Sequence, residues 1–371
     1  MNYVKLKDVC TINMGQSPSS DSYNENGHGV PFFQGNADFG ERYPVTRKWC
    51  SAPTKMAAPE DILISVRAPI GAMNYAKEEC CIGRGLAALT PNREKVAPEY
   101  IFWLLKGKNE ELNCKGTGST FKAIGRNILE ETLVPNISLE KQTECAIILE
   151  KTYRVILSRK QQLQKLDELV KARFVEMFGD PVQNSLKWVT KSLLEMGYCK
   201  NGVNFHSGDS GIEIHCLGVG DFKDYSVVDG TDYLPTISLS EEPPEESMLQ
   251  DGDIVFVRSN GNKALVGRCL VVYPHNTPTT YSGFCIRYRL TSNEVNTSYL
   301  LRVLKADSMR KKMIGRGANI QNLNQKTLAT LNIPIPPMEL QEQFAEFVNQ
   351  TDKSKVVVQK ALSKNVQYFT I

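Results

Sequence analysis

The sequence has few of the side chains that usually perform catalysis. Its four histidines, at positions 28, 206, 215 and 275, form no catalytic grouping. No stretch approaches the 18 consecutive apolar residues of a membrane-spanning helix, so we expect no membrane span. Residues 1–8 lack the apolar core of a secretion signal, which predicts a cytoplasmic protein.

Metal-ligand spacing and a strong charge of one sign are also missing. The ten cysteines show neither CxxC nor zinc-type Cys/His spacing, so we expect reduced thiols and no metal site. Lys and Arg total 44 against 41 Asp and Glu, a net charge of +3. This balance is too even to indicate nucleic-acid binding by itself, and it still permits a local basic face.

Motifs for the chemistry of DNA and nucleotides are absent as well. Methyl transfer to adenine requires an Asn/Asp-Pro-Pro-aromatic tetrapeptide, and neither Ile335–Met338 nor Glu242–Glu245 fits that pattern. No GxxxxGK[S/T] phosphate loop occurs. Asp61 and Asp253 lead into expected strands that end in arginine, which cannot act as the general base of a nuclease. We therefore expect no catalytic residues and no cofactor.

The sequence does contain an internal duplication. Four residue pairs are separated by the same 199 positions, without a gap over some forty residues: Tyr100 and Tyr299, Gly118 and Gly317, Pro135 and Pro334, Gln142 and Gln341. A repeat of this length indicates two related domains rather than a solenoid, and 371 residues suffice for two or three domains.

Further upstream the spacing changes, as expected where loops differ in length. The segment Asp61–Arg67 resembles Asp253–Arg258, so we place Arg67 and Arg258 at matched positions after matched strands. Asp38-Phe39 pairs with Asp221-Phe222, and Tyr3-Val4 with Trp188-Val189. Strands are expected at 62–66, 254–257 and 266–273. The pattern predicts one scaffold used twice with two sets of loops.

Each half ends in a long helix. Apolar residues recur every seven positions in the first helix, at Leu149, Ile156, Leu163, Val170 and Met177. About forty residues at 1.5 Å each give about 60 Å, and a stripe of that length favours pairing with the second helix. Packing of each helix on its own domain is the alternative. An antiparallel pair would relate the two domains by an approximate two-fold axis.

At this point the sequence resembles a known family, the specificity subunit of type I restriction-modification enzymes. The resemblance covers essentially the whole chain and lies in the duplicated order of short motifs. These motifs are an aromatic-led start at Trp188–Leu193, an L-x-x-G-D-I strand entry at Leu249–Ile254 with a weaker form at Ala58–Ile62, and an I-P-x-P-P-x-x-x-Q junction at Ile333–Gln341 with a weaker copy at Val134–Gln142.

The resemblance implies an α+β fold. Two similar β-rich target-recognition domains would be separated by two long helices that pair as an antiparallel coiled coil. We expect the domains at 1–137 and 181–336 and the helices at 138–180 and 337–371. The family also implies partners that carry the catalysis: two modification subunits that use S-adenosylmethionine, and restriction subunits that use ATP. This chain would be a non-catalytic subunit that binds double-stranded DNA.

Because the loops differ between the halves, we predict an asymmetric target of two short blocks around an unspecified spacer. Forked donors and acceptors read base edges: Arg and Lys suit guanine, whereas Asn and Gln suit adenine. The candidates are Gln34, Asn36, Arg42, Arg47, Arg67 and Arg84 in the first half, and Asn204, Lys223, Arg258, Asn260, Lys263 and Arg268 in the second. Arg67 and Arg258 could instead form a structural salt bridge shared by both halves.

Two glycine-rich segments, 115–120 and 316–321, bring backbone amides close to a phosphate or form tight turns. They add the candidates Lys115, Thr117, Ser119, Arg316, Asn319 and Gln321. Two other classes of function stay open. The chain could be a coiled-coil scaffold whose paired β-rich domains bind proteins, or an enzyme with a site of unrecognised type.

Overall fold

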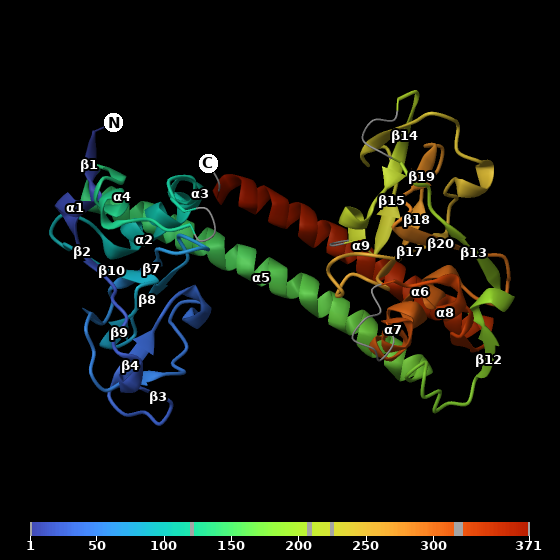
Figure 1. Cartoon of the computed structure of the whole chain (residues 1–371), viewed down its shortest axis with the longest axis horizontal. Helices are drawn as coiled ribbons and strands as arrows, with labels where there is room; N and C mark the ends of the chain where they lie inside the picture. Colours follow the sequence, from blue (N-terminus) through green and yellow to red (C-terminus); the bar gives the residue numbers. More distant parts are fainter. Residues whose placement is uncertain (1, 119–121, 206–209, 223–225, 315–321, 370–371) are drawn as a thin grey trace. The chain divides into compact units, whose positions relative to one another are not determined.

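The computed structural model describes residues 2–118, 122–205, 210–222, 226–314 and 322–369. The chain forms two compact units: unit 1 contains residues 1–160 and 360–371, and unit 2 contains residues 161–359. Each unit combines β-sheets with short helices and part of a long helix (Figure 1). The α+β class and the two β-rich regions expected from the sequence are confirmed.

Unit 1 is built on an antiparallel sheet with the strand order β2-β10-β7-β8. A second sheet has the order β3-β5-β4-β9-β6, and β1 pairs with β11. The elements are β1 Tyr3–Lys5, α1 Leu6–Val9, β2 Cys10–Met14, β3 Tyr23–Asn24, β4 Val30–Phe33, β5 Trp49–Cys50, β6 Met56–Ala57, β7 Ile62–Ser65, β8 Met73–Tyr75, β9 Cys80–Ile82, β10 Leu86–Pro91, α2 Pro98–Gly107, α3 Asn109–Cys114, α4 Arg126–Glu130 and β11 Leu133–Pro135.

Unit 2 repeats this plan, with the sheets β13-β20-β17-β18-β15, β16-β14-β19 and β12-β21. Its elements are β12 Val189–Ser192, β13 Gly197–Asn201, β14 Ile212–Leu217, β15 Val227–Asp229, β16 Thr236–Leu239, β17 Asp253–Val257, β18 Cys269–Tyr273, β19 Thr279–Tyr281, β20 Cys285–Leu290, α6 Thr297–Lys305, α7 Asp307–Ile314, α8 Gln325–Ala329 and β21 Asn332–Ile335. The expected strand at 266–273 begins three residues late, because Gly267 adopts φ +74° in a turn.

The same hydrogen bonds recur in the two units 199 positions apart. The Gln142 side chain accepts from Ala97 N–H (2.9 Å) and donates to Ile137 O (2.9 Å). Gln341 accepts from Asn296 N–H (2.8 Å) and donates to Pro336 O (2.8 Å). These paired bonds confirm the duplication inferred from the sequence, because each residue and each partner is displaced by the same number.

The match between Tyr3-Val4 and Trp188-Val189 is wrong by two residues. In unit 1 Tyr3 pairs with Pro135, and in unit 2 Thr190 pairs with Pro334. Since the two prolines correspond, Tyr3 corresponds to Thr190. Similar residue types drew the sequence match, whereas the position in each strand pair is set by backbone pairing.

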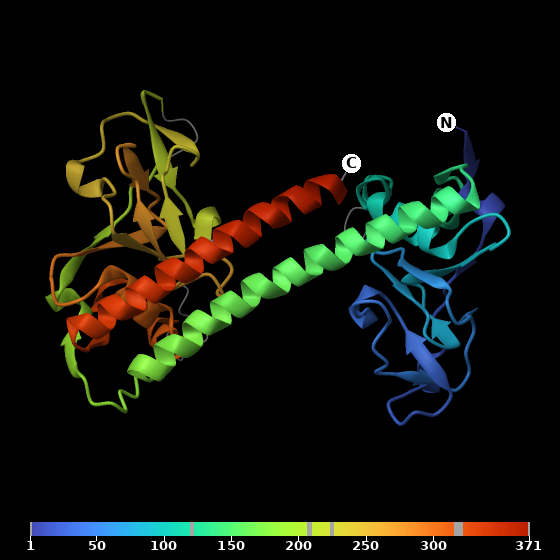
Figure 2. The ribbon, with the colours of Figure 1, turned by 180° about the vertical axis from the view of Figure 1, so that it is seen from behind.

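Two long helices follow the β-rich regions, α5 at Leu139–Phe178 and α9 at Met338–Phe369. Within unit 2 they run antiparallel and side by side (Figure 2). Lys355 lies 2.7 Å from Asp167 in an ion pair, while the Phe344 ring lies 5.5 Å from that of Phe174. From the first pair to the second, the residue number increases along α5, from 167 to 174, and decreases along α9, from 355 to 344. The expected antiparallel pairing therefore holds in this unit.

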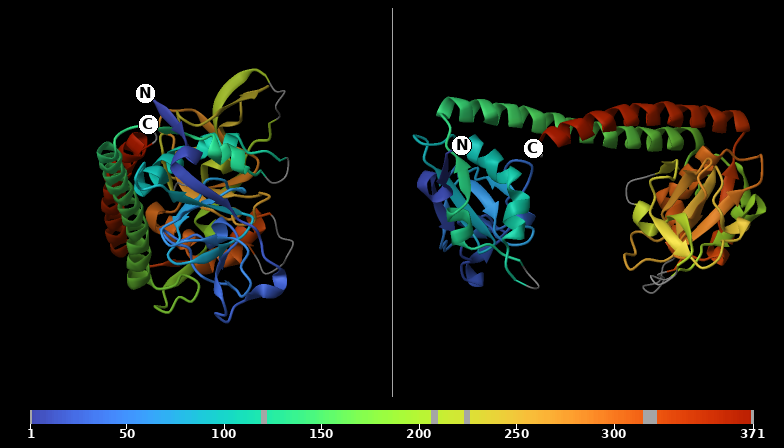
Figure 3. Two further views of the ribbon diagram at one scale, coloured as in Figure 1. Left: turned by 90° about the vertical axis from the view of Figure 1, so that its left-hand side faces the viewer. Right: turned by 90° about the horizontal axis from the view of Figure 1, so that it is seen from above.

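The helices also pack on the sheets, so both expected modes of packing coexist. Val170, Phe174 and Phe178 of α5 and Phe344 and Val348 of α9 belong to the main hydrophobic core of unit 2. Figure 3 shows these helix segments along one side of the strands of the unit. In unit 1 Ala146 of α5 joins the core in the same way. The buried helical stripe therefore anchors each long helix to a β-rich body.

Candidate nucleic-acid interface

Backbone hydrogen bonds join several loops at one end of the main sheet of unit 1. Gly83 N–H donates to Phe33 O (2.8 Å), and Val66 N–H donates to Gly85 O (2.9 Å). A further loop joins by β-bridges of Ala123 with residues 67 and 117. We call this end rim 1, and it consists of residues 33–36, 66–67, 83–85, 117 and 123.

Most described candidates of the first half lie on or beside rim 1. Arg47 donates to Ala37 O (3.0 Å), one residue beyond the rim. Lys115 forms an ion pair with Glu111 at 2.5 Å and precedes the rim by two residues. Ser119 lies outside the described residues. The candidates on the rim itself are Gln34, Asn36, Arg67, Arg84 and Thr117.

Arg42 is the exception, because it lies at the other end of the sheet. Its guanidinium is 3.3 Å from Glu150 of α5 and 5.2 Å from the centre of the Tyr75 ring. Arg42, Tyr75 and Glu150 all line a cavity of about 270 Å³. There the Lys106 ammonium stacks 3.7 Å from the Tyr153 ring centre, and burial lowers the pKa of Lys106 to about 8. These contacts give Arg42 a role in attaching α5.

Unit 2 forms the corresponding end. Ser282 N–H donates to Leu217 O (3.0 Å) as Gly83 N–H does to Phe33 O, and Arg258 N–H donates to Phe284 O (2.8 Å) as Val66 N–H does to Gly85 O. A further loop joins through Gly283 N–H, which donates to Val203 O (2.6 Å). Leu323 N–H in turn donates to Arg258 O (2.8 Å). We call this end rim 2, and it consists of residues 203–204, 258–259, 282–284 and 322–323.

Rim 2 gathers the described candidates of the second half. Asn204 and Arg258 are part of it, and the Arg258 guanidinium donates to Gly283 O (3.4 Å). The loop from β17 to β18 starts there and carries Asn260, Lys263 and Arg268. The Arg268 side chain donates to Ala264 O (3.2 Å) in that loop. The candidates Lys223, Arg316, Asn319 and Gln321 lie outside the described residues.

The two matched arginines are not equivalent in the structure. Val66 N–H donates to Gly85 O as Arg258 N–H donates to Phe284 O, so Arg258 corresponds to Val66. Arg67 corresponds to Ser259, since each forms the next bridge. Neighbouring residues of an extended segment point to opposite faces, so a shift of one residue separates the two side chains. Neither arginine forms an ion pair with a described residue, which leaves the shared salt bridge unsupported.

Two aromatic rings that are not among the candidates predicted from the sequence lie on and beside rim 2. The Phe284 side chain is 62% exposed, and Phe205, next to Asn204, is 38% exposed. Phe284 directly precedes the buried strand β20. In the sequence Gly-Phe-Cys-Ile, Phe284 adjoins the apolar residues that begin β20, which suggests that its ring is buried with them. No feature of the sequence marks the ring as exposed.

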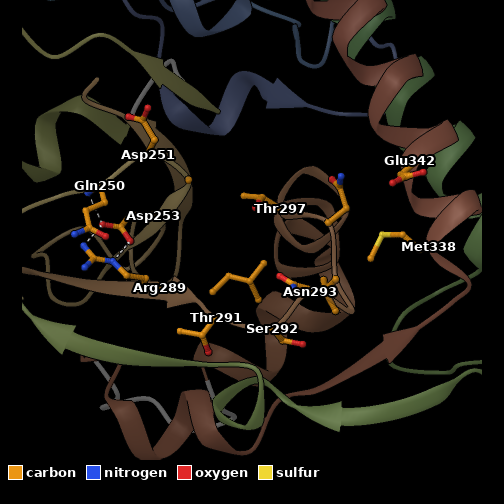
Figure 4. Close-up of a pocket in the computed structure, with 14 residues that line it drawn as sticks. Gln250, Asp251, Asp253, Arg289, Thr291, Ser292, Asn293, Thr297, Met338 and Glu342 are labelled. Atoms are coloured by element: carbon orange, nitrogen blue, oxygen red, sulfur yellow. Dashed lines mark hydrogen bonds and ion pairs between the residues drawn. The ribbon is translucent and has the colours of Figure 1, made fainter. Parts of the chain in front are cut away.

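The opposite end of β17 holds a polar cavity of about 540 Å³ (Figure 4). The Arg289 guanidinium donates twice to the buried Asp253 carboxylate, both at 2.8 Å. Thr297 of α6 and Glu342 of α9 complete the wall. No expected DNA-binding residue lines this cavity. Because Asp253 also accepts from Gln250 N–H (2.8 Å), its oxygens are already engaged in holding the strand entry.

Among the residues that the structure describes, no group of three or more His, Cys, Asp or Glu side chains is placed to hold a metal ion. Within the same residues, no helix combines the length and apolar character needed to cross a bilayer.

Comparison with known proteins matches both halves of the chain to one family. The family model of the type I restriction modification DNA specificity domain covers residues 1–168 and 224–368. The S subunit of a type I restriction-modification system from M. genitalium shares the fold, with a TM-score of 0.58 over 99% of this chain and 93% of that one, at 15% identity.

Named relatives agree with the family model. A Methanocaldococcus jannaschii protein, provisionally named the type I restriction enzyme MjaX specificity subunit, is 41% identical over 43% of this chain and 38% of its own length. The type I restriction enzyme StySPI specificity subunit of Salmonella potsdam is 25% identical over 79% of this chain and 68% of its own length. The chain thus spans well under half of the first relative. Because the family model matches most of its residues, the chain belongs to the family of type I restriction-modification DNA specificity domains.

Proposed function

We propose that this chain is the subunit that recognises DNA sequence for a type I restriction-modification complex. It binds double-stranded DNA at an asymmetric, bipartite target and directs adenine methylation by modification subunits, of which we propose two. Restriction subunits driven by ATP would use the same target. Such work on chromosomal DNA makes the cytoplasm its proposed location. The domain bounds 1–137, 138–180, 181–336 and 337–371 stay a prediction.

One observation carries the proposal: the two rims share a backbone framework and differ in side chains. Matched hydrogen bonds hold Val66 and Arg258 in corresponding places. The connection from β7 to β8 spans residues 66–72, whereas that from β17 to β18 spans 258–268. Two readers built alike and equipped differently suit a target whose halves have different sequences. The comparisons do not favour the protein-binding scaffold, because their relatives are named specificity subunits.

Base reading would come from the forked side chains of the rims, and phosphate contact from Lys115 beside rim 1 and Thr117 on it. Base contacts need forked polar groups at groove edges, while phosphate contacts need only charge and free donors. The Arg258 guanidinium uses one N–H on Gly283 O, which fixes the direction of the side chain. Its other donors suit the O6 and N7 acceptors of guanine.

The experiment is a methylome. Cells that express the chain with its cognate modification subunit should carry adenine methylation at one bipartite motif, and cells without the chain should lack methylation at that motif alone. An unchanged adenine pattern would refute the proposal. The purified chain alone should neither methylate nor cleave DNA.

Arg258→Ala tests the assignment of the rim. Loss of one base contact costs about 1–3 kcal/mol and relaxes one position in one half-site. Arg42→Ala is the matched control, because Arg42 lies away from rim 1 and should leave the motif unchanged. A uniform loss of affinity for all sequences would make Arg258 a phosphate-binding or structural residue.

A further inference from the structure

Phe284 is exposed where burial would be expected. It directly precedes β20, whose first residues, Cys285 and Ile286, are fully buried. A single exposed ring on a protein surface needs no explanation by itself. The setting of this ring on rim 2 is what distinguishes it.

The backbone that carries Phe284 is held on several sides. Phe284 O accepts from Arg258 N–H (2.8 Å) and from Ser259 N–H (3.3 Å). Phe284 N–H donates to the Ser282 hydroxyl (3.3 Å). The ring therefore projects from a fixed position, so that binding through it costs little conformational entropy.

Two polar side chains suited to bases contact Gly283, the residue before Phe284. The Asn204 side chain packs so closely on Gly283 that a Cβ there would lie 2.0 Å from its Oδ1. The Arg258 guanidinium donates to the carbonyl oxygen of the same glycine (3.4 Å). Rim 2 thus places an amide and a guanidinium on Gly283, directly before the residue that carries an exposed phenyl ring. In the major groove the thymine methyl is the apolar mark of a base pair, and Asn suits the adenine opposite.

Rim 1 cannot present such a ring. The residue that corresponds to Phe284 is Gly85, and a Cβ at Gly85 would lie 2.3 Å from Gln34 O. A contact made by Phe284 therefore has no counterpart in unit 1. Any dependence on it should appear in one half-site alone.

We infer that Phe284 is a specificity-determining residue that contacts the 5-methyl group of a thymine in the half-site read by unit 2. This inference rests on the proposed function and assigns to rim 2 a target that contains an A·T pair. The neighbouring Asn204 and Arg258 would read polar edges at or next to that pair.

Deoxyuridine tests the contact because it lacks only the methyl group of thymine. After the methylome has defined the target, each thymine of the duplex is replaced in turn, and binding by the assembled chain and modification subunit is measured at fixed salt. We expect one replacement, in one half-site, to weaken binding about fourfold, the value of one buried methyl group. The other replacements should have little effect.

Variants connect that thymine to Phe284. Phe284→Ala should bind the thymine and deoxyuridine duplexes equally, whereas Phe284→Leu should keep part of the preference. Val189→Ala is the matched control, since Val189 is 70% exposed in the same unit and lies outside rim 2. It should discriminate as the unchanged chain does.

The possible failures can be told apart. A bipartite motif without thymine on either strand of both half-sites, no sensitive replacement, or equal weakening of all duplexes by Phe284→Ala would overturn the inference and leave the proposed function intact. Absence of any chain-dependent methylation motif would overturn the proposed function itself. The deoxyuridine series uses the unchanged protein, so it decides even if a variant folds poorly.

Discussion

Replacement of Gln341 by alanine should selectively destabilise unit 2. The side chain is fully buried, and it accepts from Asn296 N–H (2.8 Å) while donating to Glu294 O (3.0 Å) and Pro336 O (2.8 Å). Alanine would leave three backbone groups without this partner, Pro336 O at a buried bond and the other two at part-buried bonds, and a buried group left unpaired costs about 1–3 kcal/mol. Because the space left can admit water, we expect a total of about 3 kcal/mol.

Hydrogen–deuterium exchange read peptide by peptide measures this loss in each unit separately. A loss of about 3 kcal/mol corresponds to exchange on the order of 100-fold faster for amides that exchange only when unit 2 unfolds. Peptides of α6 and β17 should report it, while those of α2 and β7 should not. Exchange accelerated less than about fivefold, or equally in both units, would refute the reasoning.

Controls for Gln341→Ala come from the same chain. Gln343 is exposed on the same helix, so Gln343→Ala should leave exchange unchanged in both units. Gln142→Ala should reverse the pattern and destabilise unit 1. Its effect should be smaller, because the bond from Gln142 to Lys95 O is 3.5 Å long, against 3.0 Å for the corresponding bond of Gln341.

Three further predictions concern charge and thiols. Asp253→Ala should cost about 3–5 kcal/mol in a denaturant titration, because it leaves the partly buried Arg289 unpaired, whereas the exposed Asp251→Ala should cost little. Lys106 should lose its proton near pH 8, seen as a ¹³C-methyl-lysine resonance absent from Lys106→Gln. Since its pKa is below the ordinary 10.5, the unfolded chain binds the extra proton, and unit 1 should gain stability as pH rises from about 8 to 10.5. The exposed Cys114 and Cys145 should react rapidly with a thiol reagent, and the seven buried cysteines should react slowly. Burial raises the pKa of buried thiols such as Cys10 and Cys216 to about 12, so little reactive thiolate forms. Rapid reaction of more thiols than these two and the half-buried Cys199 would contradict this expectation.

Much of the fold could be predicted because its determinants are repeated and local. Tyr100 and Tyr299 donate to Pro135 O and Pro334 O from equivalent helices, as their common spacing suggested. The proline boundaries and apolar stripes likewise marked the long helices. In these segments the residues that define the pattern are the ones that make the contacts, so the sequence carries the information directly.

The site was harder to predict, because a strand position is set by backbone pairing and not by residue type. Val66 and Arg258 occupy one framework position although nothing in their chemistry connects them. The similarity of Arg67 and Arg258 therefore misled, since a slip of one residue reverses the face to which a side chain points. Phe284 was missed for the converse reason. As an apolar residue it resembles the buried residues Cys285 and Ile286 that follow it, but its ring faces solvent.

These two errors arise from one property of the rims. Their framework is held by main-chain bonds, as between Val66 and Gly85 or between Arg258 and Phe284, and such bonds accept almost any side chain. The residues that would face DNA are consequently free to differ without loss of the fold. A valine and a glycine in rim 1 stand where rim 2 has an arginine and a phenylalanine. A scaffold of this kind keeps its stability while its chemistry at the rim changes, which is what a protein that reads two different half-sites with two copies of one unit requires.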